Sequence, residues 1–229
     1  MRIMIFYDLR NFEGALKDCG RVLQVGRVHY FLIDKINYHL NLQLEHRDLV
    51  RAYAYTGEYT VSFIKKVKDA AEKEQSADRK KKITDFLQYV EKEKDRNDRF
   101  KELTWSFHFF ELKTLPLRYN AKSIEGYQKG VDVELAVDLV SFAYKDAYDI
   151  AVVCSGDSDL QRSMDQVKSL GKRVILMSHP RCMSNELKKC ADYFIDISKM
   201  TEKDLDAISR KYIPYSADET HSRNNGTCN

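Results

Sequence analysis

The sequence predicts an α/β fold in which helices cover both faces of a parallel β-sheet and a long helical insert interrupts the chain. Two observations carry this prediction. Runs of strand length alternate with helical patterns in the second half of the chain, and several of these runs are apolar throughout. Continuous apolar runs are typical of parallel strands, because both faces of such a sheet are buried. Six strands are expected, at Arg2–Asp8, Leu49–Tyr55, Phe107–Leu112, Asp149–Ser155, Lys172–Met177 and Tyr193–Ile197.

Helical patterns connect the last strands of this series. Between Gly130 and Asp149, apolar residues recur at helical spacing in two adjacent stripes, so this helix is expected to be largely buried. A second helix is expected over Ser158–Leu170, followed by a glycine that suits a helix end, and a third over Ser184–Cys190 with Ser184 as its cap. Strands and helices alternating at these lengths predict right-handed crossovers between parallel strands.

A charged segment, residues 59–105, interrupts this alternation and is called the insert below. It contains no Gly or Pro, and its apolar residues recur every three or four positions, which predicts one long helix or a helical hairpin broken near Ser76. The stretch Lys65–Lys101 has 13 Lys and Arg against 9 Asp and Glu, whereas the whole chain has a net charge of +3. Such charges are most often a solvated helix face. Two alternatives are that these charges attract a nucleic acid strand, or that the insert mediates self-association as a homodimer.

Composition bounds the class of protein. The 229 residues are 43% hydrophobic, enough for one core with an elaboration, and we expect one domain over residues 1–200 and an extension over 201–229 with a disordered tail. No apolar run reaches the roughly 18 residues of a membrane span. The N-terminal run meets an acid at Asp8, unlike a signal peptide, so a cytoplasmic location is expected. The five cysteines lack the spacing of a disulfide framework or a structural zinc site.

Three acids follow predicted strands. Asp8 ends the first strand, and Asp157 and Asp159 follow the strand that ends at Ser155. Ligands of open α/β sheets bind beyond the carboxyl ends of the strands, near the point where strand order reverses. Carboxylates brought together there repel one another unless a cation lies among them, and oxygen ligands favour Mg²⁺ or Mn²⁺. The plainer alternative is that these acids cap helices and end a strand.

Two further acids lie on the helix after Gly130. Asp132 opens this helix, and Asp138 stands within its apolar stretch. A carboxylate on a buried helix is costly unless it is paired or bound to a metal. Asp132 could instead be a helix cap, and Asp138 could pair with Lys145. No glycine-rich turn follows the first strand, which excludes a dinucleotide fingerprint and a P-loop there.

Four runs of the sequence resemble a known family: IFYDLRNF, YQKGVDVELAVDLVSFAYKDAYDIAVVCSGDSDL, LGKRVILM and SNELKKCADYFIDI. They resemble the NYN domain of the LabA-like group within the PIN-like nuclease superfamily. The resemblance is specific over Lys129–Asp159, extends in order from Met1 to Ile197, and does not cover the insert closely. It implies a Rossmann-like (PIN-like) sheet, a divalent metal at a cluster of acids, and hydrolysis of RNA phosphodiester bonds.

Carried over by position, the resemblance implies the metal ligands Asp8, Asp132, Asp157 and Asp159. It implies further catalytic positions at Asp138, Asn11 and Ser155, with Asn11 and Ser155 orienting the phosphate or a water. Arg10 and Lys129 are candidates for contacts with the phosphates of a single-stranded RNA. Leu9 stands where the family has glycine and Leu160 where it has an aromatic residue, which would reshape the approach to the site. Two functions remain open: a Mg²⁺- or Mn²⁺-dependent endoribonuclease, or a non-catalytic or regulatory module that binds RNA or protein.

Overall fold

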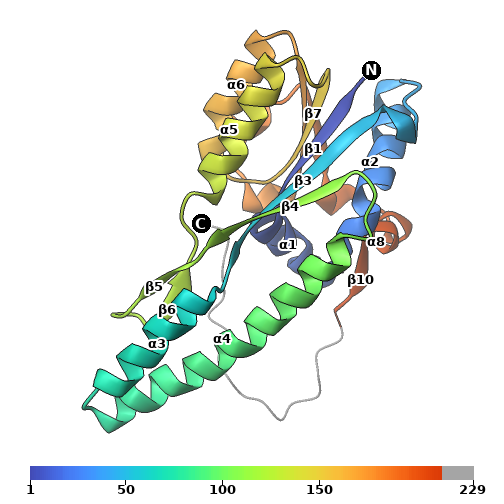
Figure 1. The fold of residues 1–229 in the computed structure, drawn as a ribbon. Helices are drawn as coiled ribbons and strands as arrows, with labels where there is room; N and C mark the ends of the chain where they lie inside the picture. Colours follow the sequence, from blue (N-terminus) through green and yellow to red (C-terminus); the bar gives the residue numbers. More distant parts are fainter. Residues whose placement is uncertain (213–229) are drawn as a thin grey trace.

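The computed structural model describes residues 1–212, and its centre is a six-stranded, wholly parallel sheet (Figure 1). The strand order is β4-β3-β1-β7-β8-β9. The strands are β1 (Ile3–Asp8), β3 (Leu49–Glu58), β4 (Phe110–Pro116), β7 (Ile150–Cys154), β8 (Arg173–Ser178) and β9 (Tyr193–Asp196). The predicted fold class and all six predicted strands are confirmed. β4 begins three residues later than expected, because the chain turns at Phe109, whose φ of 54° lies outside the strand region.

The strand order places β1 at the point where the direction of sheet growth reverses. From β1 the chain adds β3 and then β4 on one side, and it later adds β7, β8 and β9 on the other side. Asp8 is therefore the neighbour of Tyr55 on β3, and Tyr7 is the neighbour of Cys154 on β7. The carboxyl ends of β1 and β7 lie side by side at this switch point, where open α/β sheets bind their ligands.

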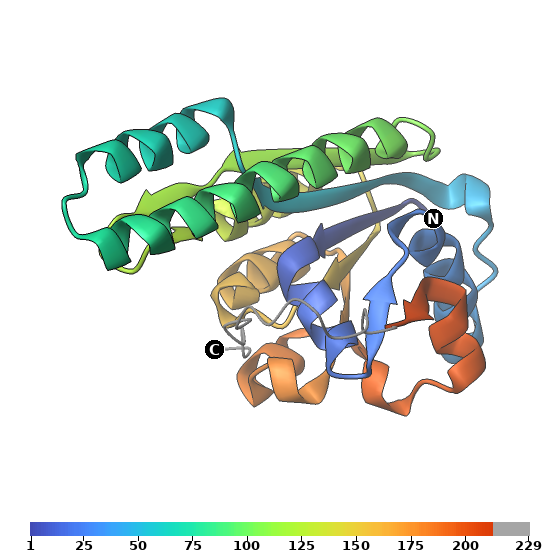
Figure 2. The ribbon, with the colours of Figure 1, turned by 90° about the horizontal axis from the view of Figure 1, so that it is seen from below.

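Helices cover both faces of the sheet (Figures 1 and 2). One core lies under α1 (Leu9–Lys17), α2 (Val25–Leu40) and α8 (Glu202–Ile208), and the other under α5 (Val131–Tyr144), α6 (Gln161–Ser169) and α7 (Asn185–Cys190). Side chains of β1 alternate between the two cores, with Ile5 and Tyr7 in the first and Met4 and Phe6 in the second. This alternation explains why the whole strand reads as apolar.

Helix α5 differs from its prediction. One stripe, Val131, Leu135, Leu139 and Ala143, is buried against the sheet as expected. The adjacent stripe is not, since Val133 is 59% and Val137 is 55% exposed. The expectation of a largely buried helix is therefore wrong, because a helix on the outer layer of a sheet buries only the stripe that faces the strands.

The insert forms a helical hairpin, one of the two predicted forms. Helices α3 (Val61–Lys73) and α4 (Ala77–Thr104) are separated by residues 74–76, and they pack beside a ribbon of β5 (Arg118–Asn120) and β6 (Glu125–Tyr127). Together these elements form an arm that extends from one end of the sheet (Figure 1). The arm has its own core around Phe63, Val67 and Ile83, with the rings of Phe63, Phe86 and Tyr119 in contact.

The segment after residue 200 packs on the main domain. Strand β10 (Ser209–Lys211) pairs antiparallel with β2 (Arg21–Leu23), and the Arg21 side chain, only 2% exposed, forms ion pairs with Glu202 and Asp206 at α8. The expected disordered tail from Pro214 lies outside the described residues.

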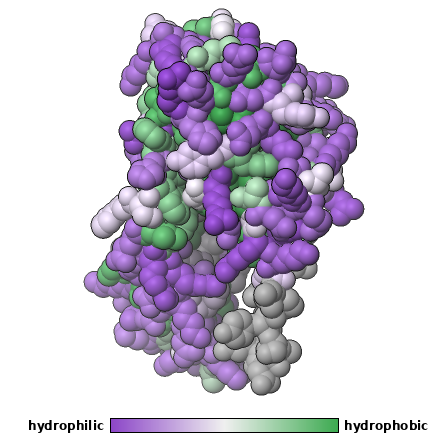
Figure 3. All heavy atoms as spheres, turned by 90° about the vertical axis from the view of Figure 1, so that its right-hand side faces the viewer, coloured by the Kyte–Doolittle hydropathy of each residue, from purple (hydrophilic) through white to green (hydrophobic). Residues whose placement is uncertain are grey.

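Short 3-10 turns complete the described chain: η1 (His46–Asp48), η2 (Ser158–Leu160), η3 (Pro180–Cys182) and η4 (Ile197–Lys199). In residues 1–212, no helix has the length and apolar character needed to cross a membrane. The face that carries α2 and α8 is mostly hydrophilic, with apolar side chains confined to small patches (Figure 3).

Candidate functional site

The carboxyl ends of β1 and β7 bring together residues that are far apart in the sequence. Asp8 is the last residue of β1 and only 6% exposed, and Ser155, which follows β7, is fully buried. The Ser155 hydroxyl donates a hydrogen bond to Asp8 Oδ2 at 3.3 Å, across 147 residues of chain. The same oxygen, Ser155 Oγ, accepts the backbone N–H of Asp157 at 3.1 Å. Ser155 therefore joins the end of β1 to the acidic turn after β7.

A second link between these two segments runs through Asn11. Asp8 is the N-cap of α1, and its Oδ1 accepts the backbone N–H of Asn11 at 3.3 Å. The Asn11 side chain in turn accepts the backbone N–H of Gly156 through Oδ1 at 2.6 Å. Leu9, which replaces the glycine of the family pattern, is buried in the core beneath α1. This departure from the pattern therefore leaves the polar contacts of Asp8 and Asn11 in place.

Gly156 lies against the backbone of another loop. A Cβ at this position would be 1.8 Å from the carbonyl oxygen of Cys182, so no larger residue fits without a shift of the backbone. The acidic turn after β7 is thus packed directly on η3. Sequence reasoning identified the turn, but it missed this contact because the partner follows a different strand.

One acid of the turn and one acid of α5 act electrostatically on Asp8. Asp157 caps η2, with its Oδ1 accepting the backbone N–H of Asp159 at 2.9 Å. Asp157 and Asp132 are half-buried, and Asp159 is exposed. The negative charges of Asp157 and Asp132 both raise the pKa of Asp8, so these three carboxyl groups form one interacting set.

The pKa of Asp8 is raised from its ordinary value of 3.8 to about 6. Burial is the largest cause, and the charges of Asp157 and Asp132 add to it, whereas the hydrogen bonds from Asn11 and Ser155 oppose it. The two charged groups with the largest effects on this pKa, Asp157 and Asp132, are both acids. The arrangement therefore concentrates negative charge that a bound cation would neutralise.

Asp138 has different surroundings. Its Oδ2 accepts a hydrogen bond from the Tyr55 hydroxyl at 2.7 Å and pairs with the ammonium group of Lys113. The cation beside Asp138 is therefore Lys113 on β4 rather than Lys145. Asp138 thus already has a cation beside it, and its role as a catalytic residue stays a prediction.

The predicted phosphate contacts, Arg10 and Lys129, are both exposed. Arg10 lies in the first turn of α1, and its charge lowers the pKa of Tyr59, which burial raises to about 12. Arg10 therefore stands between the acids and the base of the arm. Lys129 directly precedes Gly130, the N-cap of α5, whose φ of 86° requires the freedom of glycine.

A shallow groove begins at the acids and runs between α5 and α6. Asp132 and Asp159 line it together with the exposed stripe of α5, including Val133 and Val137, and with Arg162 of α6. Its volume is about 550 Å³. A space of this size beside the carboxylates is large enough for part of an extended polymeric substrate.

Comparisons with known proteins identify the family. Residues 59–199 match the NYN domain model; this range includes the insert and begins after β1, so Asp8 and Asn11 lie outside it. An uncharacterized protein of Methanocaldococcus jannaschii is 30% identical over 81 residues, which are 35% of this chain and only 34% of that protein. A crystal structure of a protein of unknown function from Vibrio parahaemolyticus has the same fold, with a TM-score of 0.53 at 16% identity over 91% of this chain and 96% of that one. Because the NYN model matches more than half of the chain, the protein belongs to the NYN domain family, which has a PIN-like nuclease fold.

Proposed function

We propose that this protein is a metal-dependent endoribonuclease of the LabA-like group, with Mg²⁺ or Mn²⁺ held by Asp8, Asp132, Asp157 and Asp159. One observation carries the proposal: a buried carboxylate, Asp8, lies at the switch point of the sheet among other acids, with a pKa raised to about 6. Carboxylates held this close repel one another unless a cation lies among them, so the arrangement favours a cation at this place.

The donor set fits a hard divalent cation. All candidate ligand atoms are carboxylate oxygens, which Mg²⁺ and Mn²⁺ prefer, and two of the acids are only half-buried, which leaves access for water and substrate. When bound, such an ion supplies Lewis acidity, which activates water and stabilises the charge that develops on the leaving oxygen. The oxygen-only set also explains why the cysteine and histidine patterns of the sequence give no sign of this site.

The chain itself contributes the positioning of these acids. The hydrogen bonds of Ser155 and Asn11 are made within the site, to Asp8 and to the turn Gly156–Asp157. We therefore assign Ser155 and Asn11 as positioning residues, which hold the two strand ends in register. Asp159, which is exposed, would complete the set of ligands at the rim of the site.

The proposed substrate is single-stranded RNA. Its backbone would meet Arg10 and Lys129, both exposed at the edges of the site, and one strand would fit the groove between α5 and α6. The exposed lysines Lys80, Lys81 and Lys82 on α4 would add attraction that does not depend on sequence. Arg79 contributes less, because it is engaged with Glu74 and with the carbonyl oxygen of Ala121.

Self-association through the arm is a separate proposal. The end of α4 and the following turn expose large apolar side chains, with Trp105 85%, Leu103 55% and Phe109 53% exposed. Exposed aromatic side chains of this size are enriched in protein interfaces. Sedimentation equilibrium of the wild type and Trp105→Glu tests this proposal, and a wild type that stays monomeric at all concentrations contradicts it.

The nuclease proposal is tested with labelled single-stranded RNA and a DNA of the same sequence, each with Mg²⁺, with Mn²⁺ and with EDTA. We expect metal-dependent cleavage of RNA that falls at least about 100-fold in Asp157→Asn, because metal stabilisation of the transition state is worth several kcal/mol. Asp34→Asn, a substitution at an exposed acid on α2, is the matched control and should cleave as the wild type does.

The outcomes separate the two functions. Cleavage that survives Asp157→Asn unchanged rules out the acidic site as its source. No cleavage of RNA or DNA with any metal, together with retained RNA binding, favours the non-catalytic module.

A further inference from the structure

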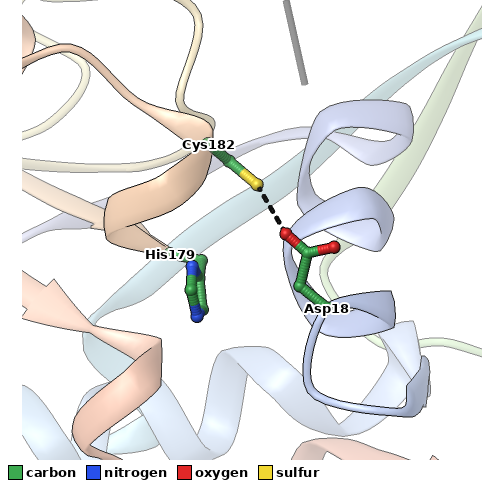
Figure 4. A group of neighbouring side chains, drawn as sticks. All are labelled: Asp18, His179 and Cys182. Atoms are coloured by element: carbon green, nitrogen blue, oxygen red, sulfur yellow. Dashed lines mark hydrogen bonds between the residues drawn. The ribbon is translucent and has the colours of Figure 1, made fainter. Parts of the chain in front are cut away.

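A second group of metal-ligating side chains lies outside the acidic site. Asp18 is the C-cap of α1, His179 directly follows β8, and Cys182 ends η3 (Figure 4). One ligand atom from each residue lies within 4.8 Å of those of the other two. His179 is 8% and Cys182 is 5% exposed, whereas Asp18 is exposed to solvent. Two buried side chains and one exposed side chain therefore converge here.

One hydrogen bond and one restricted turn relate these side chains before any ion binds. The Cys182 thiol donates to Asp18 Oδ2 at 3.4 Å, and the Arg181 backbone N–H donates to His179 Nδ1 at 3.1 Å. Pro180 occupies the first position of η3, which restricts the turn between His179 and Cys182. The backbone between His179 and Cys182 therefore loses little conformational freedom when an ion binds.

We propose that Asp18, His179 and Cys182 form a site for Zn²⁺ that is distinct from the acidic cluster. One sulfur, one nitrogen and one oxygen donor match the ligands of Zn²⁺, whereas Mg²⁺ takes oxygen donors. Three protein ligands leave the fourth tetrahedral position for water, on the side where Asp18 meets solvent. The proposal does not depend on the nuclease activity.

Binding follows a simple balance of protons and charge. The thiol of Cys182 releases its proton to solvent, and the thiolate then donates an electron pair to the ion. Asp18, no longer the acceptor of that proton, donates through a carboxylate oxygen. The thiolate and the carboxylate together balance the two positive charges of Zn²⁺, and the neutral imidazole adds none. An ion bound through Nδ1 would take over the lone pair that now accepts the Arg181 N–H, so this hydrogen bond would be lost on binding.

The site adjoins the acidic turn through the backbone. The carbonyl oxygen of Cys182 is the atom that would lie 1.8 Å from a Cβ on Gly156, so η3 and the turn after β7 are in direct contact. An ion that fixes η3 to the end of α1 therefore also restrains the neighbour of Asp157. The proposed Zn²⁺ would therefore link the end of α1 to the loop that packs on the acidic turn.

Cobalt substitution tests the proposal on the full chain, reduced and stripped of metal. Co²⁺ bound by a thiolate gives a near-ultraviolet charge-transfer band that oxygen ligands do not give, so the acidic cluster cannot produce this signal. We expect a saturable band at one Co²⁺ per chain that Zn²⁺ abolishes by competition. Cys182→Ser should remove the band, and Cys190→Ser, the same change at another buried cysteine, should keep it.

Cys182 is buried, so its substitution could disturb folding; a second variant is therefore made at the exposed ligand, Asp18. Asp18→Asn should keep the melting temperature of the metal-free protein and weaken Zn²⁺ binding by more than the roughly 10- to 100-fold that loss of a ligand's supporting hydrogen bond causes. Added Zn²⁺ should raise the melting temperature of the wild type and leave that of Cys182→Ser unchanged. No charge-transfer band in the wild type, or a band that Cys182→Ser retains, would overturn the proposal.

Discussion

Replacing Asp8 by asparagine should stabilise the metal-free protein at neutral pH. Asp8 is 6% exposed, and the negative charges of Asp157 and Asp132 act on it, so its ionised form is disfavoured in the native state. Asparagine has nearly the same shape and carries no charge. Its side-chain oxygen can still accept the Asn11 N–H, and the Ser155 hydroxyl can rotate to accept from the new amide.

The magnitude follows from the pKa of Asp8, which is raised from 3.8 to about 6. One pKa unit corresponds to 1.36 kcal/mol, so ionised Asp8 costs the native state about 3 kcal/mol. Because the native pKa of Asp8 lies above the unfolded value, the free energy of unfolding of the wild type falls by this amount as pH rises from about 4 to about 6. It falls no further above that range. Allowing for weaker hydrogen bonds, we expect a gain of about 1–3 kcal/mol in the free energy of unfolding of the variant at pH 7.5.

Urea unfolding in EDTA at pH 4 and at pH 7.5 measures the effect, with Asp34→Asn as the control at an exposed acid of α2. The gain of Asp8→Asn should appear at pH 7.5 and nearly vanish at pH 4. Mg²⁺ should then stabilise the wild type more than the variant, because only the wild type keeps the full set of ligands. A variant that is less stable than the wild type at pH 7.5, or equally stabilised at both pH values, refutes the reasoning.

Three further predictions concern Gly156, Lys113 and Arg21. Gly156→Ala should lower the free energy of unfolding by roughly 3 kcal/mol, seen in thermal melting, because its Cβ would meet a carbonyl oxygen of η3 at 1.8 Å. Lys113→Met should cost about 1–3 kcal/mol in urea unfolding, since it leaves the carboxylate of Asp138, only 15% exposed, without its cation. Arg21→Met should speed hydrogen exchange in α8 without changing RNA cleavage, because it removes both ion pairs to that segment.

The sheet could be predicted because its signal is local. Each buried strand is apolar on both faces, and the alternation of Met4 and Phe6 with Ile5 and Tyr7 between two cores requires only that helices cover both sides. The order of the strands is not local, since it depends on pairing between distant segments. The start of β4 was missed for a related reason: the left-handed turn at Phe109 has no glycine to mark it.

In the candidate site too, features with a local signal were predicted and most contacts between distant segments were not. Asp8 and Asp157 were predicted to be close, because parallel strands end at the same edge, and the charge of Asp157 indeed raises the pKa of Asp8. The partner of Asp138 was not foreseen, because Lys113 is 25 residues away and reaches it from β4. Cysteine spacing could not predict the group of Asp18, His179 and Cys182, since Asp18 and Cys182 are 164 residues apart in the sequence.

Hydrogen bonds and backbone packing hold Asp8 in a position where its ionised form is unfavourable. Ionised Asp8 destabilises the metal-free fold by about 3 kcal/mol, and the part that comes from Asp157 and Asp132 would be relieved if these acids moved away from Asp8. The hydrogen bonds of Asn11 and Ser155 oppose this movement from within, and the contact between Gly156 and η3 opposes it from outside. A bound cation would stabilise ionised Asp8 without such a movement, so we expect this rigid sheet edge to favour binding of a divalent metal.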